Sequence, residues 1–129
     1  MKLLLDTHIW LWSVLEPDRL GRSVRRELIH AANQLWLSPL STWEALMLNS
    51  KGRIHLPSDA ASWVRTASAD FREAPLTHDI AIAAQQLPFS HSDPADRFLL
   101  ATAQVLGLTL VTADRRLLGL GSIATLANR

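Results

Sequence analysis

The sequence predicts an α/β fold in which a central parallel β-sheet of about four to five strands is flanked by helices. Three short apolar runs have the length of strands and no polar interruption, as in strands that are buried on both faces: Lys2–Leu5, 35–37 and 108–111. Between these runs lie longer segments whose apolar residues recur at helical spacing. Strand and helix patterns that alternate in this way are typical of βαβ units.

The other elements follow in chain order. A helix is expected over Thr7–Leu15, and a second helix follows the strand at 35–37 and begins near Ser41. Residues 71–74 and 123–126 are weaker strand candidates. Helices are predicted over 77–87 and over 95–106, and Gly107 ends the second of them.

Length and composition limit the classes of function. The chain has 129 residues, no cysteine and a formal net charge of +1, and we place a single domain over residues 1–129. The lack of cysteine excludes a disulfide scaffold, a zinc–thiolate site and a cysteine nucleophile. The small net charge excludes bulk electrostatic binding of nucleic acid, so a nucleic-acid function must depend on a local site. The opening run MKLLLD is too short for a signal peptide or a membrane span, so we expect a soluble, cytoplasmic protein with no membrane partner.

Carboxylates follow the predicted strands at the edge where open α/β sheets bind ligands, outside the carboxyl ends of the strands. Asp6 comes directly after the first strand, and Asp114 follows the run at 108–111. Glu44 falls in the first turn of the helix expected near Ser41. Asp93 and Asp96 open the helix at 95–106, three residues apart, so both side chains could point to one side. Four separate segments therefore bring acids to one edge of the sheet.

Each of these carboxylates also fits a role in capping a helix. Three of them fit an N-cap: Asp6, Asp93 and Asp114. Asp96 fits an acid in the first helical turn, and Glu44 fits the acid of a capping box that begins at Ser41. Taken one at a time, capping is the commoner role of such residues. Acids in all four segments favour a shared site, and one carboxylate can serve both purposes.

A cluster of ionised carboxylates requires a counter-charge, because two like charges about 4 Å apart repel by about 4 kcal/mol at an effective dielectric constant near 20. Oxygen ligands without cysteine or paired histidines suit the hard ions Mg²⁺ and Mn²⁺ rather than zinc. Such an ion polarises a phosphoryl group and lowers the pKa of a bound water. The pattern therefore indicates metal-assisted phosphoryl chemistry.

Four motifs resemble, in order and over the whole chain length, the acidic motifs of the PIN-domain ribonucleases, and most closely those of the VapC-type toxins of bacterial toxin–antitoxin modules: LLLDTHIWLW, STWEAL, HSDPADRFLLATA and TLVTAD. The run HSDPADR is the most specific of them. Matched position by position, the catalytic, metal-binding quartet of the family corresponds to Asp6, Glu44, Asp96 and Asp114. Asp93 matches an additional acid of the branch that carries this run, and Thr112 matches a hydroxyl that orients metal-bound water.

The resemblance implies a PIN-like domain that cleaves single-stranded RNA with Mg²⁺ or Mn²⁺. The nucleophile would be a metal-activated water, and the products would carry a 5′-phosphate and a 3′-hydroxyl. The resemblance also implies a cognate antitoxin that blocks the site, and a homodimer. The RNA substrate is implied by the resemblance alone, whereas the phosphoryl chemistry also follows from the residues.

Basic and imidazole side chains beside the acids could have either a functional or a structural role. Arg97 follows Asp96, and the pair Arg115 and Arg116 follows Asp114. These arginines could bind a substrate phosphate, or could form salt bridges on a solvated face. His8 and His91 flank the acids, and a hydrogen-bonded structural role competes with that of a general base. The densest basic stretch could track an RNA backbone, although an exposed helix face explains it as well: Arg19, Arg22, Arg25 and Arg26.

The tryptophans divide into two groups. Trp10 and Trp12 belong to the helix over Thr7–Leu15, which is apolar nearly all round. Because one face is enough to cover the sheet, we expect the surplus to contact a second copy or the antitoxin. The remaining three are expected in the core: Trp36, Trp43 and Trp63.

Two other classes of function fit parts of the pattern. A metal-dependent phosphatase with an aspartyl nucleophile on the first strand would favour a second acid two residues after Asp6, where His8 stands. A non-catalytic binding module would keep the acids as caps only. In that case, replacing an acid by its amide would lower stability and change nothing else.

Overall fold

The computed structural model describes residues 1–57, 59–88 and 93–129. Within these ranges, five parallel strands form one sheet in the order β3-β2-β1-β4-β5. The strands are β1 (Lys2–Leu5), β2 (Gln34–Leu37), β3 (Arg72–Glu73), β4 (Thr109–Thr112) and β5 (Thr125–Ala127). The predicted α/β class with a central parallel sheet is confirmed.

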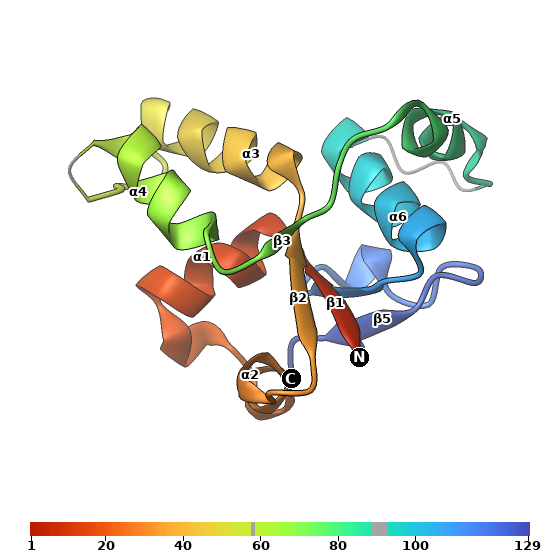
Figure 1. The fold of residues 1–129 in the computed structure, drawn as a ribbon, viewed down its shortest axis with the longest axis horizontal. Coiled ribbons are helices and arrows are strands. Elements are labelled where there is room, and N and C mark those ends of the chain that lie inside the picture. Colours follow the sequence, from red (N-terminus) through yellow and green to blue (C-terminus); the bar gives the residue numbers. More distant parts are fainter. Residues whose placement is uncertain (58, 89–92) are drawn as a thin grey trace.

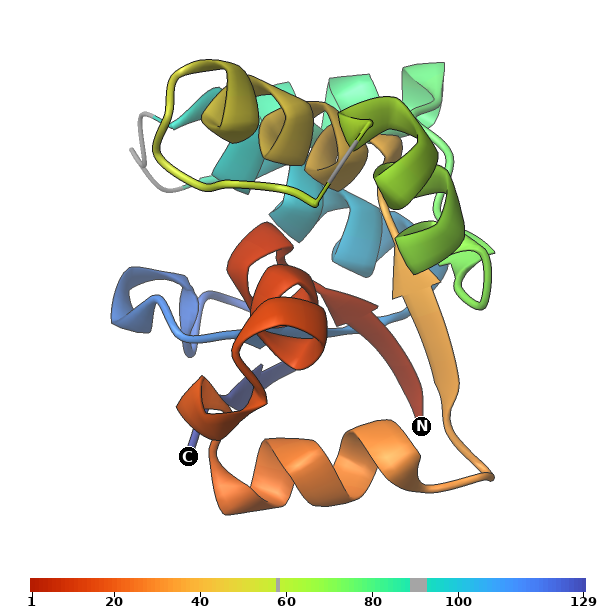
Figure 2. The same cartoon turned by 90° about the vertical axis from the view of Figure 1, so that its left-hand side faces the viewer.

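Helices cover both faces of the sheet (Figure 1). On one side lie α1 (Thr7–Leu15), α3 (Pro39–Ser50) and α4 (Ala60–Ser68), and on the other lie α5 (His78–Gln86) and α6 (Pro94–Leu106). The helix α2 (Arg22–Ile29) lies at the amino ends of the strands (Figure 2). The described ranges also contain two short 3₁₀ helices, η1 (Pro17–Arg19) and η2 (Arg115–Leu117). None of the helices in the described ranges is long and apolar enough to cross a membrane.

The strand β1 is buried on both faces, which explains its uninterrupted apolar sequence. Leu4 packs into the core beneath α5 and α6, together with residues such as Leu100. Leu3 and Leu5 point the other way, into the core beneath α1, α3 and α4. All three leucines of the strand are fully buried. Successive side chains of a strand alternate between its faces, so two cores require apolar residues at every position.

Two strands begin later than predicted, because the backbone amide of the predicted first residue donates a hydrogen bond within the preceding turn. β4 begins at residue 109 rather than 108, because the Leu108 amide donates to the Ala103 carbonyl (2.9 Å) as the chain leaves α6. Gly107 ends that helix as predicted, in the left-handed region with φ +66°. β5 spans 125–127 rather than 123–126, because the Ile123 amide closes a turn onto Leu120 (3.2 Å).

Helix boundaries shift in the same way. Thr77, predicted as the first residue of a helix, is the N-cap of α5, and its hydroxyl accepts a hydrogen bond from the Ile80 amide (3.2 Å). α6 begins at Pro94, one residue earlier than predicted. α4 is not among the predicted helices, and Val64 is its buried position.

The predicted interface role of Trp10 and core position of Trp43 are wrong. Trp10 is 0% exposed, and its indole N–H donates to the Ala67 carbonyl (3.1 Å), because α1 lies between the sheet and the α3–α4 pair. Trp43 is 57% exposed on the outer face of α3. The predicted core placement of Trp36 and Trp63 is confirmed. Each is partly buried, Trp36 against the core beneath α5 and α6 and Trp63 against the core beneath α1, α3 and α4.

The strand order creates the crevice where a site is expected. From β1 the chain proceeds outward to β2 and β3, then returns to the opposite side of β1 to form β4 and β5. The loops that leave β1 and β4 therefore diverge from adjacent strands. Ligands of open α/β sheets bind outside the carboxyl ends of strands at such a point.

Candidate active site

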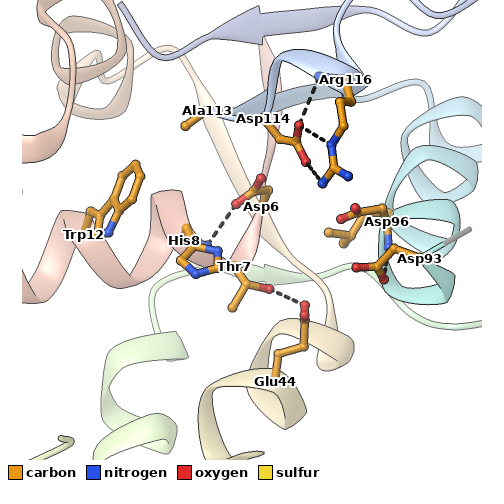
Figure 3. A pocket seen from close by; sticks show the side chains of 11 residues that line it. Asp6, Thr7, His8, Trp12, Glu44, Asp93, Asp96, Ala113, Asp114 and Arg116 are labelled. Carbon is orange, nitrogen blue, oxygen red and sulfur yellow. Dashed lines mark hydrogen bonds and ion pairs between the residues drawn. The ribbon is translucent and has the colours of Figure 1, made fainter. Parts of the chain in front are cut away.

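A pocket of about 330 Å³ opens at the carboxyl ends of β1 and β4, and five carboxylates line it (Figure 3). They come from four segments: Asp6 before α1, Glu44 in α3, Asp93 and Asp96 at the start of α6, and Asp114 after β4. Thr7, His8, Trp12 and Arg116 are among the other lining residues. The structure thus brings together every acid that the sequence singled out.

Asp6 serves both as a helix cap and as a wall of the pocket. Its Oδ1 accepts hydrogen bonds from the amides of His8 (2.9 Å) and Ile9 (3.4 Å) at the start of α1. Its Oδ2 accepts from the hydroxyl of Thr112 (2.5 Å). The Asp6 backbone amide donates to the Val111 carbonyl (3.0 Å), so β4 fixes the backbone as well. The carboxylate is therefore held rigidly at the floor of the pocket.

Thr112 connects the carboxylates that follow the two central strands. Its side chain is fully buried at the end of β4. Besides donating to Asp6, its hydroxyl oxygen accepts the backbone amide of Asp114 (3.0 Å). Thr112 thus holds the loop of one acid against the side chain of another.

Replacing Thr112 by Val is expected to lower the free energy of unfolding by about 1–3 kcal/mol, because it removes the hydrogen-bonding partner of two largely buried polar groups. Thr102→Val is the matched control. Thr102 is also fully buried, but its hydroxyl donates to the Phe98 carbonyl within α6, so its removal leaves the helical ladder in place. Chemical denaturation measures the free energy of unfolding of both variants. If both lose equal stability, the hydrogen bonds of Thr112 to Asp6 and Asp114 stabilise the fold no more than the hydrogen bond of Thr102 does.

The capping box predicted from Ser41 to Glu44 is wrong. α3 begins three residues earlier, at Pro39, and its N-cap is Ser38, whose Oγ accepts from the Leu40 amide (3.1 Å). Pro39 is the reason, since a proline at the first helical position starts the helix there. Glu44 consequently lies in the second turn of α3 rather than in the first.

Contacts with Thr7 orient the Glu44 side chain toward the pocket. The Thr7 hydroxyl donates to Glu44 Oε1 (2.6 Å) and also lies 2.9 Å from the hydroxyl of the buried Ser41. Burial raises the pKa of Glu44, and the hydrogen bond from Thr7 lowers it. The charges of Asp93, Asp96 and Asp6 raise the same pKa further, so the net shift is upward.

This raised pKa gives a pH-dependent prediction for Glu44→Gln in buffer with EDTA. The folded protein binds the proton more tightly than the unfolded chain, so wild-type stability falls as the pH rises from the ordinary glutamate pKa through the raised one. The amide removes that cost and still accepts from Thr7. The melting temperature of the variant is therefore expected to exceed that of wild type at pH 7 and to match it near pH 4. A variant that is less stable at both pH values would contradict the prediction.

The two acids of α6 enter the pocket from its start. Asp93 is the N-cap, and its Oδ1 accepts from the amides of Ala95 (2.9 Å) and Asp96 (3.4 Å). Asp96 lies in the first helical turn. Amide dipoles at a helix start favour negative charge, which helps two carboxylates to lie side by side there.

Of the two arginines that the sequence places beside Asp114, Arg116 is the one that lines the pocket. It binds both oxygens of Asp114, through Nε to Oδ1 (3.1 Å) and through Nη2 to Oδ2 (2.8 Å). This pairing raises the pKa of the guanidinium, with smaller contributions from Asp96 and Asp93. Arg115, the other arginine of this pair, lines a separate hollow with Arg129.

The remaining candidates lie elsewhere or at the rim. Arg97 donates through Nη2 to the Ala84 carbonyl (2.7 Å), and so joins α6 to α5. The arginines of α2 lie at the opposite end of the sheet from the pocket (Figure 2). His8 lies at the pocket wall, and His91 falls outside the described residues.

Comparisons with known proteins agree with the fold and the motifs. The family model of the PIN domain matches residues 3–121. Ribonuclease VapC22 of Mycobacterium tuberculosis is 37% identical over 116 residues, which cover 89% of this chain and 88% of that protein. The chain therefore belongs to the PIN-domain family, in the branch of the VapC-type ribonucleases.

Solved structures share the fold at lower identity. VapBC2 of Rickettsia felis bound to a DNA fragment from its promoter superposes with a TM-score of 0.76 at 16% identity, covering 98% of both chains. The DNA-bound VapBC of Salmonella typhimurium also gives 0.76 at 16% identity, covering 100% of this chain and 99% of that one. At these identities the likeness concerns the fold alone.

Proposed function

We propose that this protein, as a single domain over residues 1–129, is a Mg²⁺- or Mn²⁺-dependent endoribonuclease and the toxin of a toxin–antitoxin module. The observation that carries the proposal is the gathering of five carboxylates from four segments in one pocket, in a chain of the PIN-domain family. The 37% identity to a protein named a ribonuclease supports RNA as the substrate.

The donor set of the pocket fits a hard divalent ion, since it consists of carboxylate and hydroxyl oxygens. Within residues 1–57, 59–88 and 93–129, no group of three or more His, Asp or Glu side chains is arranged to hold an ion as it stands. Both oxygens of Asp114 are paired with Arg116, so a bound ion would compete with this guanidinium for the Asp114 carboxylate. We assign the ion to Asp6, Glu44, Asp96 and Asp114, with Asp93 beside them. When bound, the ion would polarise the scissile phosphate and lower the pKa of the attacking water.

The other residues of the pocket hold these carboxylates in place. Thr112 fixes Asp6 and the loop of Asp114. In the proposed reaction Thr112 would orient the attacking water through Asp6, whose carboxylate it holds. Thr7 fixes Glu44. Arg116 is the guanidinium within the pocket, and a guanidinium binds a phosphate through two parallel hydrogen bonds. We therefore assign the contact with the scissile phosphate to Arg116 rather than to Arg97 or Arg115.

The proposed activity is tested with purified protein and 5′-labelled structured and unstructured RNAs, in Mg²⁺, in Mn²⁺ and in EDTA. Internal cuts that require the metal and leave a 5′-phosphate and a 3′-hydroxyl are expected. If folded protein free of antitoxin cuts none of the RNAs, and neither ion raises its melting temperature, the proposal is wrong and a binding module is the better description.

The proposed partners are a cognate antitoxin and a second copy of the chain, in the cytoplasm. The carboxyl end of α1 offers an apolar surface for such contacts, with Val14 46% exposed and Leu15 36% exposed. Light scattering of the purified protein measures the oligomeric state, and a monomer at all concentrations would contradict the dimer.

A further inference from the structure

A second hollow, of about 550 Å³, adjoins the carboxylate pocket. The two share His8 and Trp12 as lining residues, so they are neighbours along α1. Its remaining walls come from the end of α1, from η1 and from the segment after α3, and they include Arg19, Arg53 and His55. In Figure 3, Trp12 lies at the edge of the group, with His8 between it and the carboxylates.

We propose that this hollow, defined by Trp12, Arg19, Arg53 and His55, is a nucleotide subsite that binds the single-stranded RNA next to the scissile phosphate. The inference rests on the ribonuclease function proposed above. It adds the path by which the strand leaves the carboxylate pocket, and the residues that hold its next base and phosphate.

The charges of the two cavities support this assignment. The carboxylate pocket has five acids against Arg116, which disfavours the phosphates that flank the scissile one. The adjoining hollow has two arginines against one acid, Glu16, and carries two histidines in addition. A polyanion held at the pocket is therefore attracted toward this side.

The aromatic geometry supports binding of a base. The Arg19 guanidinium lies over the Trp12 ring, 4.2 Å from its centroid, and Glu16 holds the same guanidinium through an ion pair of 3.2 Å. The His8 ring lies 5.9 Å from the Trp12 ring at a tilt of 56°. Unpaired bases stack on aromatic rings and on arginine planes, and here both surfaces are already positioned.

The apolar part of the hollow is compatible with a nucleobase. Leu11, Leu15 and Ile54 line it beside the cations. A nucleotide has an apolar base face and an anionic phosphate, so it matches a cavity that offers both surfaces. A peptide segment of the antitoxin would use the apolar part but would benefit from the arginines only through acidic residues.

The test compares cleavage kinetics of wild type with Arg19→Ala/Arg53→Ala, using Arg72→Ala as the matched control. Arg72 is also exposed and also lies over a tryptophan, Trp36 (5.9 Å), but it lines neither cavity. The double variant is expected to raise KM about tenfold or more with kcat nearly unchanged. In a plot of the logarithm of the RNA-binding constant against the logarithm of the salt concentration, the slope should become less steep by about 0.7 for each phosphate that the variant no longer neutralises. The control is expected to stay within about twofold of wild type, because exposed substitutions away from a site have small effects.

A second measurement tests the interaction with the base. After the cut is mapped, substrates with an abasic position next to it are expected to raise KM for wild type, and to have little further effect in Trp12→Ala. Melting temperatures confirm that each variant is folded.

Failure of the inference is distinguishable from failure of the proposed function. If wild type does not cleave RNA, the proposed function fails first. If wild type cleaves, and the double variant keeps the wild-type KM and salt slope, the nucleotide subsite is wrong. Abolished antitoxin binding in the same variant, with RNA kinetics unchanged, would also overturn the subsite and make the hollow a protein-docking surface.

Discussion

Asp96→Asn is expected to reduce RNA cleavage at least about a hundredfold, because changes in residues that merely support metal ligands already cost about 10–100-fold. Asp96 lies in a pocket with four other carboxylates. The amide keeps the shape of the side chain but removes its charge and one candidate metal ligand. Cleavage of a labelled RNA in Mg²⁺ measures the reduction.

The same substitution is expected to leave the melting temperature in EDTA unchanged or raised. Two effects compete, since an acid in the first helical turn stabilises the helix by about 0.3–1 kcal/mol, whereas several like charges in one pocket repel more strongly. The repulsion prevails if the acids form one cluster. If they serve only as caps, the variant would instead melt lower and Mg²⁺ would have no effect on its stability.

Asp79→Asn is the matched control for Asp96→Asn. Asp79 lies in the first turn of α5, is exposed and does not line the pocket. Its amide variant is expected to lose a little stability and to keep full activity. If Asp79→Asn abolished cleavage as completely as Asp96→Asn, the effect would not be specific to the pocket.

Trp10→Ala is expected to lower the free energy of unfolding by about 3–5 kcal/mol, the usual cost of removing a fully buried large aromatic side chain. Trp10 is 0% exposed, its ring centroid lies 6.1 Å from that of Trp63, and its indole donates to the Ala67 carbonyl. Small proteins are stable by only about 5–15 kcal/mol, so the variant is expected to unfold at far lower temperature.

Trp43→Ala provides the control, because Trp43 is 57% exposed. Its substitution is expected to change the free energy of unfolding by less than about 0.5 kcal/mol. Urea titration of both variants measures the difference. Equal destabilisation would mean that the two tryptophans are equally buried, contrary to the structure.

The sequence by itself determined the parallel sheet and the place of its acids. The apolar run Lys2–Leu5 predicts a strand buried on both faces, and Asp6 directly after it must lie at the carboxyl end of that strand. Asp114 follows β4 in the same way. These conclusions depend on local periodicity and on chain order, which the sequence contains in full.

Only the tertiary structure decided which side chains turn inward. Neighbouring residues of an α-helix point about 100° apart, and those of a 3₁₀ helix about 120° apart, so the start of a helix determines which residue faces a pocket. For this reason Arg116 rather than Arg115 meets Asp114, and Glu44 reaches the pocket from the second turn of α3. Trp10 is buried because α1 lies between the sheet and the α3–α4 pair, whereas Trp43 lies on the outer face of α3 and is exposed. The sequence pattern shows which residues are apolar or charged, but the neighbours that cover them come from segments far along the chain.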